Sequence, residues 1–177
     1  MSNPFDLTSS GPMPGMIDAR RPLDDPDRES PAVELQTLIW GVLTDDARLM
    51  TLANGVYDFV PEPRRDIAGE ENRPWGAMQG YVSFGPLDVT NDDAECIMAG
   101  QYTFQLDCWS RQKNSLHCRR MVDRIRTLLN NTAYPIADNA MVGMTIEAWR
   151  WMRDPDGLTT HGMVSVRAFV EDGGEDD

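Results

Sequence analysis

The histidines and cysteines of this chain are the first candidates for metal binding or nucleophilic catalysis, and there are five: His117, His161, Cys96, Cys108 and Cys118. A zinc site needs pairs of such ligands at close spacing that point to one place. Among the five, only His117 and Cys118 are neighbours, and adjacent side chains of a helix point in different directions. We expect His117 on the exposed side of its helix and Cys118 in the core, with no metal ion and no cofactor. The odd number of cysteines, without framework spacing, favours reduced thiols.

An acidic turn, Asp154-Pro155-Asp156-Gly157, superficially resembles a calcium-binding loop. It lacks the third acidic ligand before the glycine and the glutamate that closes such a loop. It is instead typical of a turn between two strands. The sequence also contains no glycine-rich phosphate loop, no GxSxG nucleophile elbow and no HExxH helix. We therefore expect that the protein is not an enzyme.

Hydrophobic periodicity predicts an α+β fold, an antiparallel sheet with helices packed on one face. Ser30 followed by Pro31 is typical of a helix start, and Gly85-Pro86 is expected to end a strand. A long loop, 61–76, is rich in proline and charge, and we expect it to be exposed. The predicted elements, in order, are a helix over 31–43, a short helical turn near 46–52, a short strand within 56–60, strands over 78–84 and 101–109, a helix over 113–130, and a hairpin of strands over 141–152 and 161–170.

Strand 101–109 has the clearest alternation in the chain. Its even positions from Tyr102 to Cys108 are apolar, whereas the opposite face carries Gln101, Thr103, Gln105 and Asp107. An antiparallel sheet that is covered on one side shows this pattern. In the first hairpin strand, Val142, Met144, Ile146 and Ala148 alternate with Thr145, Glu147, Trp149 and Trp151, so the two sets are expected on opposite faces.

The charge of the chain is strongly acidic and unevenly distributed. The 177 residues contain 29 Asp and Glu against 16 Lys and Arg, a net charge of −13. Residues 1–31 contribute −3 and the last seven residues −5, so the body carries −5. An acidic surface repels phosphate, so we expect no sequence-independent binding of nucleic acid and no association with anionic membranes. No apolar run is long enough to cross a bilayer, and the N-terminus has no secretory signal pattern.

These distributions divide the chain into three parts. We expect an extended N-terminal arm over 1–31, one α+β domain over 32–170 and an acidic C-terminal tail over 171–177. The arm is either a solvated tail or a segment that orders against a neighbouring subunit.

One side of the helix over 113–130 is basic, with Lys113, Arg119, Arg120, Arg124 and Arg126 opposed only by Asp123. A solvated helix face explains this pattern simply. The other interpretation is a subunit interface in which Arg119, Arg120, Arg124 and Arg126 meet an acidic loop of the next copy. The candidate loops are 66–71 and 91–95, the latter with Asp92, Asp93 and Glu95. Such a head-to-tail contact closes into a ring when the rotation permits.

The order of these motifs resembles the tail terminator, or tail completion, proteins of long-tailed phages and gene transfer agents. The resemblance covers about residues 33–170. The residues that carry it are the helix Leu35 to Leu43; Asp45-Asp46-Ala47 leading into Leu52-Ala53-Asn54-Gly55-Val56-Tyr57-Asp58; the strand Gly80-Tyr81-Val82 to Gly85; Trp109-Ser110 before the helix; and Arg153-Asp154-Pro155-Asp156-Gly157-Leu158 with His161-Gly162.

The resemblance implies an α+β virion structural protein without catalytic residues. It implies a homo-oligomer, a six-membered ring that caps the tail tube protein at the head-proximal end and docks to the neck, connector or head-closure protein. It would be assembled in the host cytoplasm, and DNA would pass through without specific binding. Gln101, Thr103, Gln105 and Asp107 would then line the lumen or form a ring contact.

Two alternatives remain at this stage. One is another neck component, such as a head-closure or adaptor protein, which shares the ring geometry. The other is a small cytoplasmic enzyme with a hidden site, for which the loop 61–76 with Trp75 is the place to look.

Overall fold

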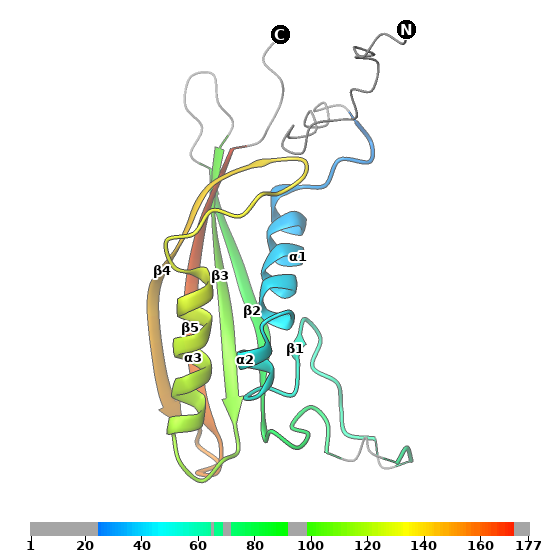
Figure 1. The fold of residues 1–177 in the computed structure, drawn as a ribbon, viewed down its shortest axis with the longest axis vertical. Coiled ribbons are helices and arrows are strands. Elements are labelled where there is room, and N and C mark those ends of the chain that lie inside the picture. The colour runs from blue at the N-terminus through cyan, green and yellow to red at the C-terminus, as the bar shows by residue number, and fades with distance from the viewer. Residues whose placement is uncertain (1–24, 65, 69–71, 92–98, 172–177) are drawn as a thin grey trace, which may run out of the picture.

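The computed structural model describes residues 25–64, 66–68, 72–91 and 99–171. Within these residues, three helices and five strands form one layer of helices on one sheet (Figure 1). Their bounds are α1 Pro31–Thr44, α2 Ala47–Met50, β1 Val56–Tyr57, β2 Gly80–Asn91, β3 Ala99–Ser110, α3 Leu116–Leu129, β4 Ala140–Arg153 and β5 Thr160–Glu171. The α+β class predicted from the sequence is confirmed.

The sheet has the strand order β1-β2-β3-β5-β4. The four long strands pair antiparallel, as expected, but β1 pairs parallel to β2, so the sheet is mixed rather than wholly antiparallel. β1 and β4 form the two opposite edges (Figure 1). The hairpin of β4 and β5 turns at Asp154–Thr159, where the predicted turn is confirmed.

β2 is longer than the sequence suggested. Gly85-Pro86 does not end the strand, because the chain forms a bulge between Phe84 and Leu87 and then continues to Asn91. Proline lacks a backbone N–H and is tolerated in a strand only at an edge or a bulge. Among the described residues, β1 pairs with β2 at Val82 and Ser83 alone, so no described strand lies outside β2 at Pro86.

The helices cover one face of the sheet, with α1 and α3 side by side along the strands (Figure 1). The even positions of β3 from Phe104 to Cys108 are buried, as their alternation predicted. Residues of one side of α3 complete this core: Cys118, Met121, Val122, Ile125 and Leu129 are each 0% exposed. The opposite face of the sheet has no helix over it within the described residues.

A buried carboxylate connects α1 to the segment before β4. Glu34 lies in the first turn of α1 and accepts hydrogen bonds from the backbone N–H groups of Ala137 and Asp138, each at 2.7 Å. Its other oxygen accepts from Asn139 Nδ2 at 2.7 Å. Ser30 and Pro31 begin this helix at the predicted position. The remainder of the predicted arm, residues 1–24, and the acidic tail after Glu171 lie outside the described residues.

Candidate functional site

His117 is buried, contrary to the expectation from its place beside Cys118. It is 5% exposed, and its Nδ1 lies 2.8 Å from Ser110 Oγ. Gly80 makes this possible, because a Cβ at that position would lie 2.8 Å from His117 Cε1. Burial lowers the pKa of His117 below its ordinary value of 6.5, so the ring is neutral at pH 7. His117 therefore does not belong to the exposed, basic side of α3, where the sequence pattern placed it.

His161 lies on the face of the sheet without helices. Its ring stacks on Trp109 with centroids 3.9 Å apart, and its Nε2 lies 2.7 Å from Asp107 Oδ1. Gln105 Nε2 donates to the same carboxylate at 3.0 Å. Asp107 is only 8% exposed. Its hydrogen bonds with Gln105 and His161 fix the orientation of the three side chains. This group contains no free nucleophile, since the carboxylate and the ring bind each other.

Cys108 and Cys118 are free and fully buried. Burial raises the pKa of both thiols, that of Cys118 to about 12, so neither is a thiolate at neutral pH. Cys96 lies outside the described residues. Over the described ranges, no three histidine, cysteine or acidic side chains gather in a way that suits a metal ion. Nor does any helix there have the length and apolarity to cross a membrane.

In the acidic turn after β4, the carboxylate of Asp156 binds groups of the turn itself. Asp156 accepts hydrogen bonds from the backbone N–H groups of Leu158 and Thr159, each at 2.8 Å, and from Thr159 Oγ1 at 2.6 Å. The bond from the Thr159 hydroxyl is the main reason that the pKa of Asp156 is lowered. Gly157 takes the left-handed conformation with φ of 69°. These contacts make a structural turn.

The loop 61–76 is only partly exposed. Trp75 is 8% exposed and packs edge-on against Tyr81 with centroids 4.8 Å apart. Arg111 covers its other side, with Cζ 4.0 Å from the ring centroid. The loop is expected to be exposed and to be the place to look for a hidden site, but its Trp75 is buried. This side chain anchors the loop to the start of β2.

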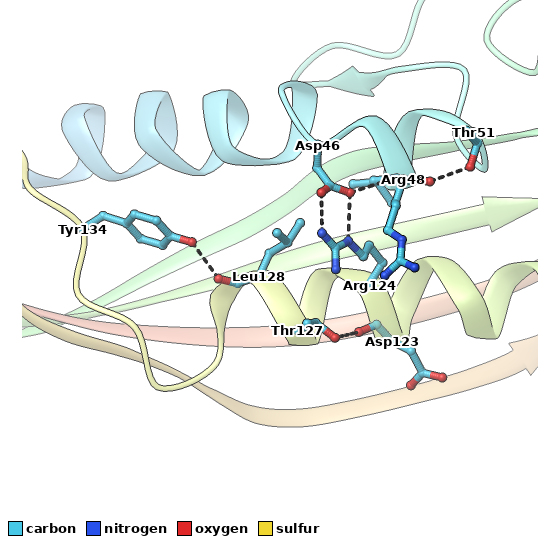
Figure 2. A network of polar contacts seen from close by, with 9 residues as sticks. Asp46, Arg48, Thr51, Asp123, Arg124, Thr127, Leu128 and Tyr134 are labelled. Atoms are coloured by element: carbon cyan, nitrogen blue, oxygen red, sulfur yellow. Dashed lines mark hydrogen bonds and ion pairs between the residues drawn. The ribbon is translucent and has the colours of Figure 1, made fainter.

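The basic side of α3 divides into residues with different roles. Figure 2 shows Arg124 reaching α2, where its Nε and Nη2 donate to Asp46 Oδ1 and Oδ2 at 2.9 and 2.5 Å. Asp46 also caps α2 by accepting from Leu49 N–H at 2.7 Å. The hydrogen bond from Arg124 is the main reason that the pKa of Asp46 falls to about 2. Arg124 is therefore committed to a contact within its own chain.

Two other arginines of α3 lie over tryptophans of β4. Arg126 Cζ is 3.6 Å from the ring centroid of Trp149, and Arg119 Cζ is 4.7 Å from that of Trp151. Arg126 also pairs with Asp123 at 3.1 Å. Arg120 is exposed, beside Arg48 and Arg124. A cation over an aromatic face is attracted by the ring quadrupole, and both partners remain available at the surface.

The acidic residues expected to oppose these arginines are mostly not placed. Asp92, Asp93 and Glu95 lie outside the described residues, as do Gly69 to Glu71. Asp66 is described and pairs with Arg64 at 2.9 Å. The interface predicted from the charge pattern thus stays a prediction.

The polar face of β3 is present as the alternation predicted. Gln101, Thr103 and Gln105 are half-buried, and Asp107 is buried and hydrogen-bonded to Gln105 and His161. The neighbouring strands align further polar and charged residues with this face. The charged ones at matching register positions are Asp88, Asp107, Arg150, Arg167 and Glu171, and Glu147, in the bulge of β4, pairs with Arg167.

Exposed aromatic residues form the features that sequence reasoning missed. Trp149 and Trp151 are 42% and 39% exposed, and Trp40 on α1 is 49% exposed. The two β4 tryptophans were expected on the face opposite the core. A bulge between Ile146 and Ala148 reverses the alternation, which places them on the helix side, opposite Val164 and Gly162 of β5. The sequence shows the two tryptophans, but it gives no local indication of the bulge that changes the face on which they lie.

Comparison with known proteins gives a family and a fold. The family model described as "Tail completion protein gp17" matches residues 37–171. A chain of the solved structure titled "Virion of native gene transfer agent (GTA) particle" superposes with a TM-score of 0.66 at 21% identity. That match covers 79% of this chain and 96% of that chain. A search of curated proteins finds no match.

Proposed function

Because the chain belongs to the tail completion protein gp17 family, it is a structural protein of a virion tail, and we propose that it forms the ring that ends the tail tube. In this proposal six copies cap the tube at its head-proximal end and join it to the neck, while DNA passes through the centre. The protein acts by protein contacts alone, without catalysis. Its partners are further copies of itself, the tail tube protein and a neck or head-closure protein.

The observation that carries this proposal is the sheet face without helices. Its polar residues suit a wall that faces water and a passing duplex, whereas α1 and α3 would form the outer wall of the ring. We therefore assign Gln101, Thr103, Gln105 and Asp107 to the lumen rather than to a contact between subunits.

The charges on this face also suit the passage of DNA. Proteins grip DNA chiefly by neutralising phosphates with Lys and Arg. Among the charged residues at its register positions, three are acidic and two are arginines, and Arg167 already pairs with Glu147. A lumen built from such faces gives phosphate few cationic partners, so a duplex slides without being held.

Particle assembly tests the position of the protein. We expect that particles made without the gene have tails of uncontrolled length that do not join to heads, and that cryo-EM of complete particles places a sixfold ring of this chain between tube and neck. A position on the head portal, away from the tube end, would establish the head-closure alternative. A strict monomer absent from particles would overturn the proposal.

Substitutions on the sheet face test the lumen assignment. Gln101→Lys with Gln105→Lys places twelve new cations in a six-membered lumen, so we expect rings that assemble normally but release DNA more slowly, most clearly at low salt. Thr127→Lys on the exposed side of α3 is the control and leaves release unchanged. Equal release rates for both variants would contradict the assignment.

A further inference from the structure

Two surfaces with exposed aromatic residues lie at opposite edges of the sheet. The first, which we call the aromatic edge, consists of Trp149 and Trp151 of β4 with Arg126 and Arg119 of α3 above their rings. The two indoles are 42% and 39% exposed. Beside this patch, from Glu147 to Arg153, β4 has no strand on its outer side within the described residues. Half-exposed tryptophans beside an unpaired strand edge are unusual on a free surface.

The second surface is a groove of about 310 Å³ between α1 and the start of the sheet, lined by Val33, Gln36, Thr37, Trp40, Asp58 and Phe84. Val33 and Trp40 are 48% and 49% exposed. Trp40 is held by a hydrogen bond from Nε1 to the backbone oxygen of Val56 at 3.2 Å, which turns the body of the indole toward the groove. We call this the α1–β1 groove.

The two surfaces carry opposite charges. The aromatic edge presents the guanidinium groups of Arg119 and Arg126, whereas the α1–β1 groove presents the carboxylate of Asp58. Asp58 accepts from Gln36 Nε2 at 2.9 Å, which leaves further acceptor positions on the carboxylate. Aromatic and arginine side chains are the residue types that most often dominate protein interfaces.

The strand register places both surfaces at the same height. Along one row of the sheet, Val56 aligns with Val82, Cys108, Gly162 and Trp151. In the next row, Tyr57 aligns with Arg150, so Asp58 lies near the level of Trp149. Both surfaces also lie on the helix side, because Trp149 and Trp151 contact α3 and Asp58 contacts α1. Rotation about an axis along the strands brings points of equal height together.

We propose that the aromatic edge of one copy packs into the α1–β1 groove of the next copy around the ring. Trp149 and Trp151 fill the groove beside Trp40, and Arg119 and Arg126 bind Asp58 across the contact. β4 of one copy then lies antiparallel to β1 of the next, since β4 and β1 run in opposite directions in the sheet. This contact rests on the proposed ring and names its interface, in which Arg119 and Arg126 have a partner other than the acidic loops.

Such a contact is heterologous, because two different surfaces of the same chain meet. A chain that lacks one surface still offers the other. A variant broken only at the aromatic edge and a variant broken only at the groove must therefore combine as a pair and then stop, because the remaining two surfaces are both defective. An interface that uses one self-complementary patch does not behave in this way.

Native mass spectrometry of the purified full chain tests the contact. The edge variant is Arg119→Glu with Trp151→Ala, and the groove variant is Asp58→Arg with Trp40→Ala. We expect rings from the wild-type chain, monomers from each variant alone and one-to-one dimers from their mixture. We also expect each variant to raise the dissociation constant of the contact at least tenfold.

Variants that reverse one charge and keep every aromatic ring distinguish a weakened contact from a misfolded chain. Arg119→Glu alone and Asp58→Arg alone should each weaken the ring, and combining them in one chain should restore it. Lys113→Glu and Leu158→Ala alter exposed residues that belong to neither surface and should leave the ring intact. Circular dichroism of each variant establishes that the fold is retained.

The outcomes separate the contact from the proposed function. Rings that persist in both double variants, or variants that fail to pair when mixed although folded, overturn the contact and leave the ring in place. A wild-type chain that stays monomeric at tens of micromolar and in particles overturns both.

Discussion

The ion pair between Asp46 and Arg124 gives a stability prediction that can be worked from the structure. The pKa of Asp46 is lowered from 3.8 to about 2. At 1.36 kcal/mol per pKa unit, the ionised carboxylate contributes at most about 2.4 kcal/mol to the free energy of unfolding. Because the two side chains are 12% and 23% exposed, solvent screens part of this energy. We therefore expect a coupling energy of about 1 kcal/mol between the two side chains at pH 7.

A double-mutant cycle measures this coupling. Asp46→Asn keeps an oxygen that can cap α2 at Leu49, and Arg124→Gln removes the charge but keeps most of the length of the side chain. Urea unfolding of the wild-type chain, both single variants and the double variant gives the coupling free energy. All four proteins must be compared at one concentration, because assembly adds to apparent stability. Arg120→Gln on the same helix is the control and should change stability by less than about 0.5 kcal/mol.

The pH dependence has a definite sign. The folded chain holds the pKa of Asp46 below its unfolded value, so the stabilisation is complete above about pH 5 and is lost as pH falls through about 2. The difference in stability between wild type and Arg124→Gln should therefore shrink steadily from pH 5 downward. A coupling energy indistinguishable from zero, or a difference that stays constant between pH 5 and pH 2, would refute the reasoning.

Three further predictions concern buried groups. Glu34→Ala leaves the N–H groups before β4 without their acceptor and should cost about 3 kcal/mol in urea unfolding; a cost under 1 kcal/mol would show that water replaces the carboxylate. Gly162→Ala places a methyl group 2.6 Å from Val122 Cγ2 and should lower stability by about 1–3 kcal/mol, so an unchanged denaturation midpoint would contradict the tight packing. In a Cys96→Ser chain, the raised pKa and burial of Cys108 and Cys118 should leave both thiols unreactive toward DTNB at pH 8 until the chain unfolds; rapid native labelling would show that the core opens.

The sequence predicted correctly those elements whose conformation depends mainly on residues close by in the chain. The alternation over 101–109 identified β3 and its buried face, because a strand covered on one side needs no information from elsewhere in the chain. Ser30 and Pro31 located the start of α1 for the same reason. The turn at 154–159 is also local, since Asp156 accepts hydrogen bonds from Leu158 and Thr159 within it.

Long-range contacts account for most of the differences. Proline at position 86 predicts the end of β2, but the strand continues because no described residue pairs with its outer side there. His117 is buried because Gly80, far away in sequence, leaves room for its ring. Arg124 appeared equivalent to its basic neighbours until Asp46, 78 positions earlier, was found to bind it. None of these three residues carries a local signal that distinguishes it.

The second of the two bulges in β4, between Ile146 and Ala148, has the largest consequence for the proposed ring. Side chains in a strand alternate between faces, so one extra residue reverses every position that follows it. In a regular strand, Trp149 and Trp151 would lie on the polar face, where they would place two large aromatic rings in the proposed lumen. The bulge between Ile146 and Ala148 moves them to the helix side, where Arg126 and Arg119 cover them. The same residue insertion thus keeps two further aromatic rings off the face proposed for the lumen and assembles the aromatic edge, so one insertion serves both surfaces of the proposed ring.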